Sequence, residues 1–156
     1  MSVMRLAFDT NLLAYAEGAG DAARTDAAHR LVKACIAADG GVQVFVPAQV
    51  LGELFNVLTR KLRQPAAQAR VVVRRWSETF KVAEGGWSAF QAATDLCVDH
   101  GLQYWDALIF CVAAEQRCRL LLSEDMLEGF TWRGVTVVNP FAAELHPLLR
   151  EALPRF

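Results

Sequence analysis

The chain has 156 residues, of which 54% are hydrophobic and 21% are charged, a composition that excludes an intrinsically disordered protein. One globular domain spanning residues 1–156 is expected, because a chain of this length can bury a substantial core. Its 16 basic and 17 acidic residues give a net charge of −1, which excludes a uniformly basic nucleic-acid coat but leaves room for a local basic patch.

The first half of the chain alternates short apolar runs with helical patterns. Residues 4–8 form a run too short for a helix, and residues 42–46 are rich in β-branched side chains, so both segments predict buried strands. A cap at Thr25 or Asp26 predicts the start of a helix that ends near Ala38. Further helices are predicted over residues 12–16, 48–62 and 65–79.

The second half continues the alternation. Ser88 is expected to cap a helix that stops at Gly101, and the tail after Pro140 is expected to be helical or irregular. Because strands alternate with helices, we predict an α/β sandwich with a parallel central sheet covered on both faces. The remaining predicted elements are short strands over residues 80–83, 119–122 and 135–138 and a helix over residues 104–117.

Neither a membrane segment nor a secretion signal is apparent. No apolar run reaches the roughly 18 residues of a membrane helix, and the first residues lack the pattern of a signal peptide, so we expect a cytoplasmic protein. Cys35, Cys97, Cys111 and Cys118 form no CxxC pair and lie in apolar surroundings. We therefore expect buried free thiols.

Acidic residues follow two of the predicted strands. Asp9 comes directly after the first strand, and Asp125 comes shortly after the strand over residues 119–122. Functional groups of open α/β sheets gather beyond the carboxyl ends of the strands. The alternatives are that Asp9 only caps the following helix and that Asp125 only belongs to a turn.

Two further acids interrupt apolar helix faces. Glu53 lies three residues after Val50, and Asp106 lies three residues before Ile109. A solvated edge position for Glu53, or a favourable place near a helix N-terminus for Asp106, is the alternative. If the four acids converge, each pair about 5 Å apart repels by about 3 kcal/mol, so the cluster would share protons or bind a cation. Ligands that are all oxygen favour Mg²⁺ or Mn²⁺ over Zn²⁺.

Four segments, FDTNLLAYA, PAQVLGELFNVL, YWDALIFCVA and LLLSEDM, resemble the acidic motifs of PIN-domain nucleases. The resemblance spans Phe8 to Pro140 and is strongest to the VapC toxins of type II toxin–antitoxin pairs. It implies a three-layer α/β/α sandwich and a Mg²⁺- or Mn²⁺-dependent endoribonuclease that hydrolyses phosphodiesters. It further implies that Asp9 and Asp106 are the principal metal ligands. The implied catalytic set is Asp9, Glu53, Asp106 and Asp125, with Thr10, Asn11 and Ser123 as the polar residues that shape the site.

Partners follow from charge and from the same resemblance. Since a carboxylate cluster repels phosphate, an RNA substrate requires cations nearby, although solvated helix faces are the alternative for these side chains. The family implies an antitoxin that inserts an apolar helix into a groove, and a homodimer. Other functions remain open: RNA processing, a non-catalytic binding module, or, less well matched because Asn11 replaces an expected Asp, a haloacid-dehalogenase-type phosphatase. The candidate RNA-binding cations are Arg60, Lys61, Arg63 and Arg74.

Overall fold

The computed structural model describes residues 3–156. Within that range six strands form one sheet in the order β3-β2-β1-β4-β6-β5. Every neighbouring pair is parallel except β5 and β6, which confirms the predicted parallel sheet. The strands are β1 (Met4–Phe8), β2 (Val42–Pro47), β3 (Lys81–Ala83), β4 (Leu120–Leu122), β5 (Thr131–Trp132) and β6 (Val135–Val138).

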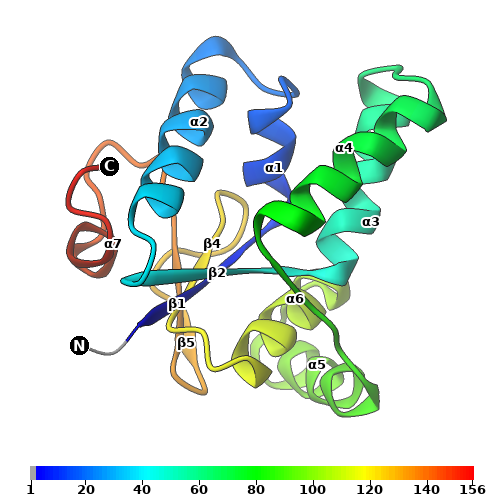
Figure 1. Cartoon of the computed structure of the whole chain (residues 1–156). Helices are drawn as coiled ribbons and strands as arrows, with labels where there is room; N and C mark the ends of the chain where they lie inside the picture. The colour runs from blue at the N-terminus through cyan, green and yellow to red at the C-terminus, as the bar shows by residue number, and fades with distance from the viewer. Residues whose placement is uncertain (1–2) are drawn as a thin grey trace.

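Helices cover both faces of this sheet. Figure 1 shows α1 and α2 on one side and α5 and α6 on the other, so the predicted α/β/α layering is confirmed. The pair α3 and α4 forms an arm beyond the end of β2. The helices are α1 (Thr10–Ala16), α2 (Ala22–Ala37), α3 (Ala48–Asn56), the π-helical turn η1 (Val57–Lys61), α4 (Ala66–Thr79), α5 (Trp87–His100), α6 (Tyr104–Glu115) and α7 (Pro147–Ala152).

The central strands are continuous apolar runs in the sequence because their side chains are buried in the core. Leu6, Ala7 and Phe8 in β1 have no exposed surface, and the same holds for all of β4. Strands covered by helices on both faces have no polar side, so the alternation typical of half-exposed strands is missing. The core around β1 and β4 thus holds the ends of these two strands in fixed positions.

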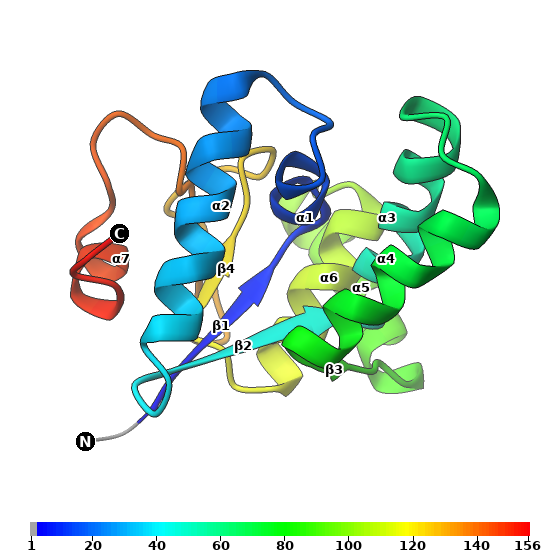
Figure 2. The same ribbon diagram turned by 45° about the horizontal axis from the view of Figure 1, so that its top comes forward.

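The register brings two strand ends side by side. Phe8 pairs with Leu122, and the Asp9 amide donates to the Leu122 carbonyl at 3.0 Å. The Ser123 amide in turn donates to the Val138 carbonyl at 3.0 Å. Figure 2 shows β1 and β2 running to the same edge, where α1 and α3 begin. Residues that follow β1 and β4 therefore share one edge of the sheet.

Two predicted helix starts are wrong. Asp21, not Thr25 or Asp26, caps α2, and its side chain accepts a hydrogen bond from the Arg24 amide at 2.8 Å. The apolar pattern placed this start too late because the first turn of α2 carries only alanine as an apolar residue. Helix α5 begins at Trp87 after Gly86, and the Ser88 hydroxyl donates to Glu115.

Other features agree with the sequence or add to it. Gly101 ends α5 in the left-handed region at φ 72°, as its position predicted. The four cysteines are free, and all but the half-buried Cys97 are fully buried. Strand β5 was not predicted, because two residues carry no periodicity. In residues 3–156 no helix has the length and apolar character needed to span a membrane.

Candidate active site

Asp9 lies at the carboxyl end of β1 and is only 4% exposed. Its Oδ2 accepts a hydrogen bond from the Ser123 hydroxyl at 2.6 Å, while Oδ1 accepts from the Thr10 amide at 2.7 Å. The hydrogen bond from the Thr10 amide makes Asp9 the N-cap of α1, so the capping role considered for Asp9 is confirmed. A cap alone does not require the hydrogen bond from Ser123, whose buried hydroxyl lies just after the neighbouring strand β4.

Glu53 connects the arm to the end of β1. The Thr10 hydroxyl donates to Glu53 Oε2, and Gln49 Nε2 donates to Oε1 at 2.9 Å. Gln49 Nε2 also lies 3.3 Å from the carbonyl oxygen of Trp105, the residue before Asp106. The start of α1 and the start of α6 are thereby both linked to α3, through the side chains of Glu53 and Gln49.

Asp106 is in the first turn of α6, where the helix dipole favours a negative charge. Its own amide donates to the Gln103 side chain at 3.0 Å. Within residues 3–156 its half-buried carboxylate takes part in none of the side-chain hydrogen bonds or ion pairs. This carboxylate is therefore available to an incoming group.

The pKa values of Asp9 and Asp106 are both raised. Burial and, to a smaller extent, the charges of Asp106 and Glu53 raise the pKa of Asp9 to about 6, although the hydrogen bonds from Ser123 and Thr10 lower it. Burial also raises the pKa of Asp106, together with the charges of Glu53 and Asp125. Asp9 and Asp125 follow the neighbouring strands β1 and β4, while Thr10 contacts Glu53 on α3 and Gln49 joins α3 to the start of α6, so the four acids lie at one edge of the sheet.

Asp125 is the most exposed of the four acids. Its Oδ2 accepts a hydrogen bond from Asn11 Nδ2 at 3.1 Å. The other amide atom of Asn11, Oδ1, is buried and has no hydrogen-bond partner in the described part of the chain. An unpaired buried acceptor is costly and is commonly satisfied by water or an ion.

The residue types suit a hard divalent cation, although the side chains are not gathered as a complete ligand set. Within residues 3–156 no three Asp, Glu, His or Cys side chains form a group that could hold a metal ion by themselves. Mg²⁺ usually keeps several waters and needs only one or two carboxylates plus a substrate phosphate. Asp9 and Asp106 offer two carboxylates of this kind, and the charge of Glu53 acts on both of them.

The predicted RNA-binding cations lie on the arm. Arg60 and Lys61 are exposed in η1, Arg63 is exposed with φ 56°, and Arg74 is exposed on α4. Arg60 to Arg63 follow Glu53 by 7 to 10 residues. At 1.5 Å per helical residue this places them about 10–15 Å along the arm from Glu53.

Trp132 and Arg133 lie away from the acids. The Arg133 guanidinium stacks 4.2 Å above the Trp132 ring, in the turn that precedes β6. Because β4 and β6 are parallel, this turn is at the opposite edge of the sheet from Ser123. The Trp132 ring packs edge-on against Phe110 at 5.9 Å, at the edge of the core.

Sequence analysis did not identify Gln49. A glutamine in a helix has no signature of its own, and only its position four residues before Glu53 suggests a contact. The structure adds the second contact, to α6, that makes Gln49 part of the site.

Comparison with known proteins places these features in a family. A family model described as the PIN domain matches residues 6–126. The VapC20 toxin of Mycobacterium tuberculosis, described as cleaving the sarcin-ricin loop, is 25% identical, with 74% of this chain and 86% of that chain covered and a TM-score of 0.58. The comparison with curated proteins found no match.

Two toxin–antitoxin complexes share the fold at lower identity. A chain of the VapBC2 complex from Rickettsia felis, bound to promoter DNA, is 15% identical over 87% of this chain and 98% of that one, with a TM-score of 0.61. A chain of a toxin–antitoxin complex from Klebsiella pneumoniae is 20% identical over 86% and 97%, with a TM-score of 0.58.

Proposed function

The chain belongs to the PIN domain family, and from that premise we propose that it is a metal-dependent endoribonuclease and the toxin of a toxin–antitoxin pair. The observation that carries the proposal is the convergence of Asp9, Glu53, Asp106 and Asp125 on one edge of the sheet. Four unrelated caps or turns do not require their carboxylates to meet.

In this proposal Asp9 and Asp106 hold Mg²⁺ or Mn²⁺. When bound, the ion would polarise a phosphate oxygen and lower the pKa of a water molecule. Ser123 and the Thr10 amide fix the Asp9 carboxylate in one orientation. Glu53 or Asp125 would orient the attacking water and accept its proton. Because the nucleophile is water, the products are a 3′-hydroxyl and a 5′-phosphate.

RNA would approach along the arm. The side chains of Arg60, Lys61, Arg63 and Arg74 are exposed on the arm and can neutralise backbone phosphates, which offsets the repulsion of the acids. Separate positions for cations and acids allow the arm to bind RNA while the acids act on one phosphodiester.

We assign the antitoxin to the groove between α3 and α4. The groove has a volume of about 640 Å³ and is lined by apolar side chains, including Leu51, Phe55 and Val73, with Arg70 and Arg74 at its side. Its occupant would be an apolar helix with acidic residues facing these two arginines. The VapBC complexes above support such a partner, and we propose a homodimer on the same family basis.

Cleavage assays on the purified chain test the enzymatic part of the proposal. Labelled RNA should be cut with Mg²⁺ or Mn²⁺ and left intact with a chelator. Asp9→Asn and Asp106→Asn should each abolish cutting. Asp39→Asn is the matched control, because Asp39 is exposed just before β2, at the opposite edge of the sheet. Cutting that survives both site variants would contradict the assigned site.

A further inference from the structure

The segment that carries Asp125 has little regular structure to hold it. Residues 123–126 follow β4 and belong to no helix or strand. The amides of Asp125 and Met126 both point to the Ser123 hydroxyl oxygen, at 3.2 Å each. That hydroxyl also donates to Asp9, so one atom anchors the start of the segment. The direction of the Asp125 side chain therefore depends on further contacts.

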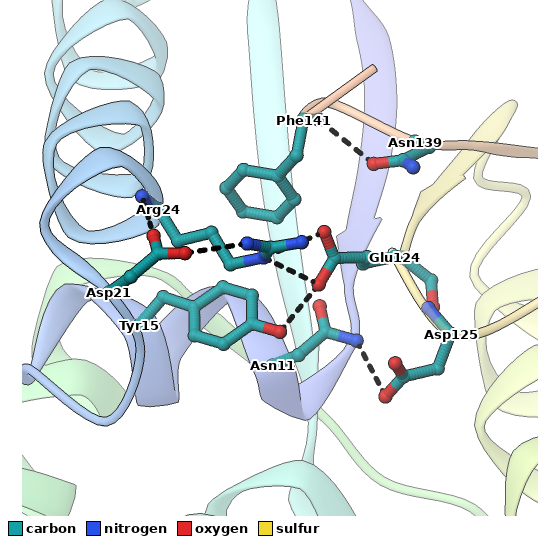
Figure 3. A network of polar contacts seen from close by, with 9 residues as sticks. Asn11, Tyr15, Asp21, Arg24, Glu124, Asp125, Asn139 and Phe141 are labelled. Carbon is teal, nitrogen blue, oxygen red and sulfur yellow. Dashed lines mark hydrogen bonds and ion pairs between the residues drawn. The ribbon is translucent and has the colours of Figure 1, made fainter.

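A second anchor is formed at Glu124, as Figure 3 shows. The Tyr15 hydroxyl donates to Glu124 Oε1 at 2.5 Å, and Arg24 Nε lies 3.0 and 2.9 Å from its two carboxylate oxygens. Arg24 is held in turn by Asp21 at 2.8 Å. The Phe141 ring packs edge-on against Tyr15 at 5.3 Å. We call Tyr15, Arg24 and Glu124 the Glu124 clamp.

The clamp and the Asp125 contact start from the same helix face. Asn11 and Tyr15 are four residues apart on α1, so their side chains project in the same direction. Asn11 bonds Asp125, and Tyr15 bonds Glu124, the residue before it. Glu124 and Asp125, which are adjacent in the chain, are thus held by Tyr15 and Asn11, which lie one turn apart on α1. The two contacts set the orientation of the backbone between Glu124 and Asp125.

The two adjacent acids are electrostatically different. Despite partial burial, which raises it, the hydrogen bonds from Arg24 and Tyr15 hold the pKa of Glu124 below its usual value. Its side chain is 17% exposed, and its charge is matched by Arg24. Within residues 3–156 no cation pairs with Asp125. The negative charge of Asp125 alone is left for the site.

We propose that the Glu124 clamp positions Asp125, and that Glu124, Arg24 and Tyr15 are positioning residues for the reaction at the acid cluster. This inference rests on the proposed nuclease function. It assigns a role to three residues that are not members of the acidic catalytic set. Tyr15 and Glu124 lie within the motifs FDTNLLAYA and LLLSEDM, and Arg24 lies on α2.

A double-mutant cycle in single-turnover RNA cleavage tests the coupling. Glu124→Ala is expected to slow cleavage about 10–100-fold, the range typical of residues that orient a ligand or catalytic group. In an Asp125→Ala background the same change should cost less than about twofold, because its effect passes through Asp125. Equal slowing in both backgrounds would overturn the proposal.

Milder variants separate positioning from loss of folding. Tyr15→Phe removes one hydroxyl and is expected to slow cleavage severalfold. Glu124→Gln keeps an acceptor for Tyr15 and Arg24 and should retain more activity than Glu124→Ala. The matched control is Arg30→Ala, which breaks the exposed Arg30–Asp26 pair on the same helix as Arg24 and should leave cleavage unchanged.

Amide hydrogen exchange supplies a readout that needs no RNA or metal. In Glu124→Ala and Tyr15→Phe, exchange at Asp125 and Met126 should be about tenfold faster than in the original chain, with the amides of β1 and β4 unchanged. Unchanged exchange at these two amides would refute the clamp, whatever the activity of Asp125→Ala. If the original chain cuts no RNA with Mg²⁺ or Mn²⁺, the nuclease proposal fails, and exchange still decides whether Glu124 orders the segment.

Discussion

The Ser123 hydroxyl donates a 2.6 Å hydrogen bond to Asp9 Oδ2 and so joins the carboxyl ends of β4 and β1. This bond favours the charged form of Asp9 in a position where burial opposes it. It also holds the carboxylate in one orientation. The bond is therefore expected to control both the charge and the geometry of a metal-binding oxygen.

Ser123→Ala should shift the acidic limb of the pH profile. Without the hydroxyl the pKa of Asp9 rises further above its value of about 6, so the charged form needs a higher pH. We expect the acidic limb of kcat/KM to move to higher pH and the rate near neutrality to fall about tenfold. Ser123→Thr keeps the hydroxyl and should restore the profile. An identical profile for Ser123→Ala would separate this bond from catalysis.

Asp9 should also set how the stability of the metal-free chain depends on pH. Its pKa is raised from 3.8 to about 6, so between these values the folded state keeps a proton that the unfolded state has lost. Stability is therefore expected to fall as pH rises from about 4 to about 6, by about 1–3 kcal/mol. Urea unfolding across this range measures the change. Asp9→Asn should flatten the curve, and an equally steep curve in that variant would assign the effect to other groups.

Asp106→Asn should stabilise the chain without metal and weaken stabilisation by metal. Burial and the charges of Glu53 and Asp125 disfavour the charged form of Asp106. Removing that charge is expected to raise Tm by about 2–4 °C, the shift that about 1 kcal/mol produces in a domain of this size. Added Mn²⁺ should then raise Tm less than in the original chain. Asp39→Asn serves as the control. If Mn²⁺ shifts the Tm of Asp106→Asn and of the original chain equally, Asp106 is not a metal ligand.

The sequence predicts which polar residues lie at the ends of the buried strands. Leu6 to Phe8 and Leu120 to Leu122 are buried runs that stop at polar residues, and the physics of parallel sheets then brings Asp9 and Ser123 together. The roles assigned to these residues came from the family resemblance, and they stay predictions until variants are assayed.

Contacts between elements distant in the chain were beyond prediction. Gln49 lies 56 residues from Trp105, and Glu124 lies 100 residues from Arg24, so no local pattern links either pair. Glu124 also stands beside Asp125, and nothing in the sequence distinguishes the acid paired with an arginine from the one left unpaired. Such contacts are fixed by the packing of helices on the sheet, which no local sequence pattern specifies.

Gln49 offers a direct test of the link between α3 and α6. Gln49→Ala removes the hydrogen bonds to Glu53 and to the Trp105 carbonyl, so Glu53 and the start of α6 lose a shared constraint. Cleavage is expected to slow about 3–10-fold with little change in KM, and Gln49→Glu should slow it more by placing a like charge beside Glu53. Gln68→Ala, an exposed glutamine on α4, is the control. A change in KM alone would point to RNA binding instead.

The salt dependence of RNA binding tests the arm separately from the acids. The logarithm of the RNA-binding constant falls linearly with the logarithm of salt concentration, and each lost phosphate contact makes this slope shallower by about 0.7 for single-stranded RNA. Changing Arg60, Lys61 and Arg63 together to Gln should therefore make the slope shallower by about 2. Binding is measured with Asp9→Asn, which prevents cutting. The control changes three exposed basic residues outside the arm, Lys33, Arg117 and Arg119, to Gln. An equal change of slope in the control would mean that basic residues over the whole surface bind RNA. If RNA binds along the arm, only the three arm residues should change the slope.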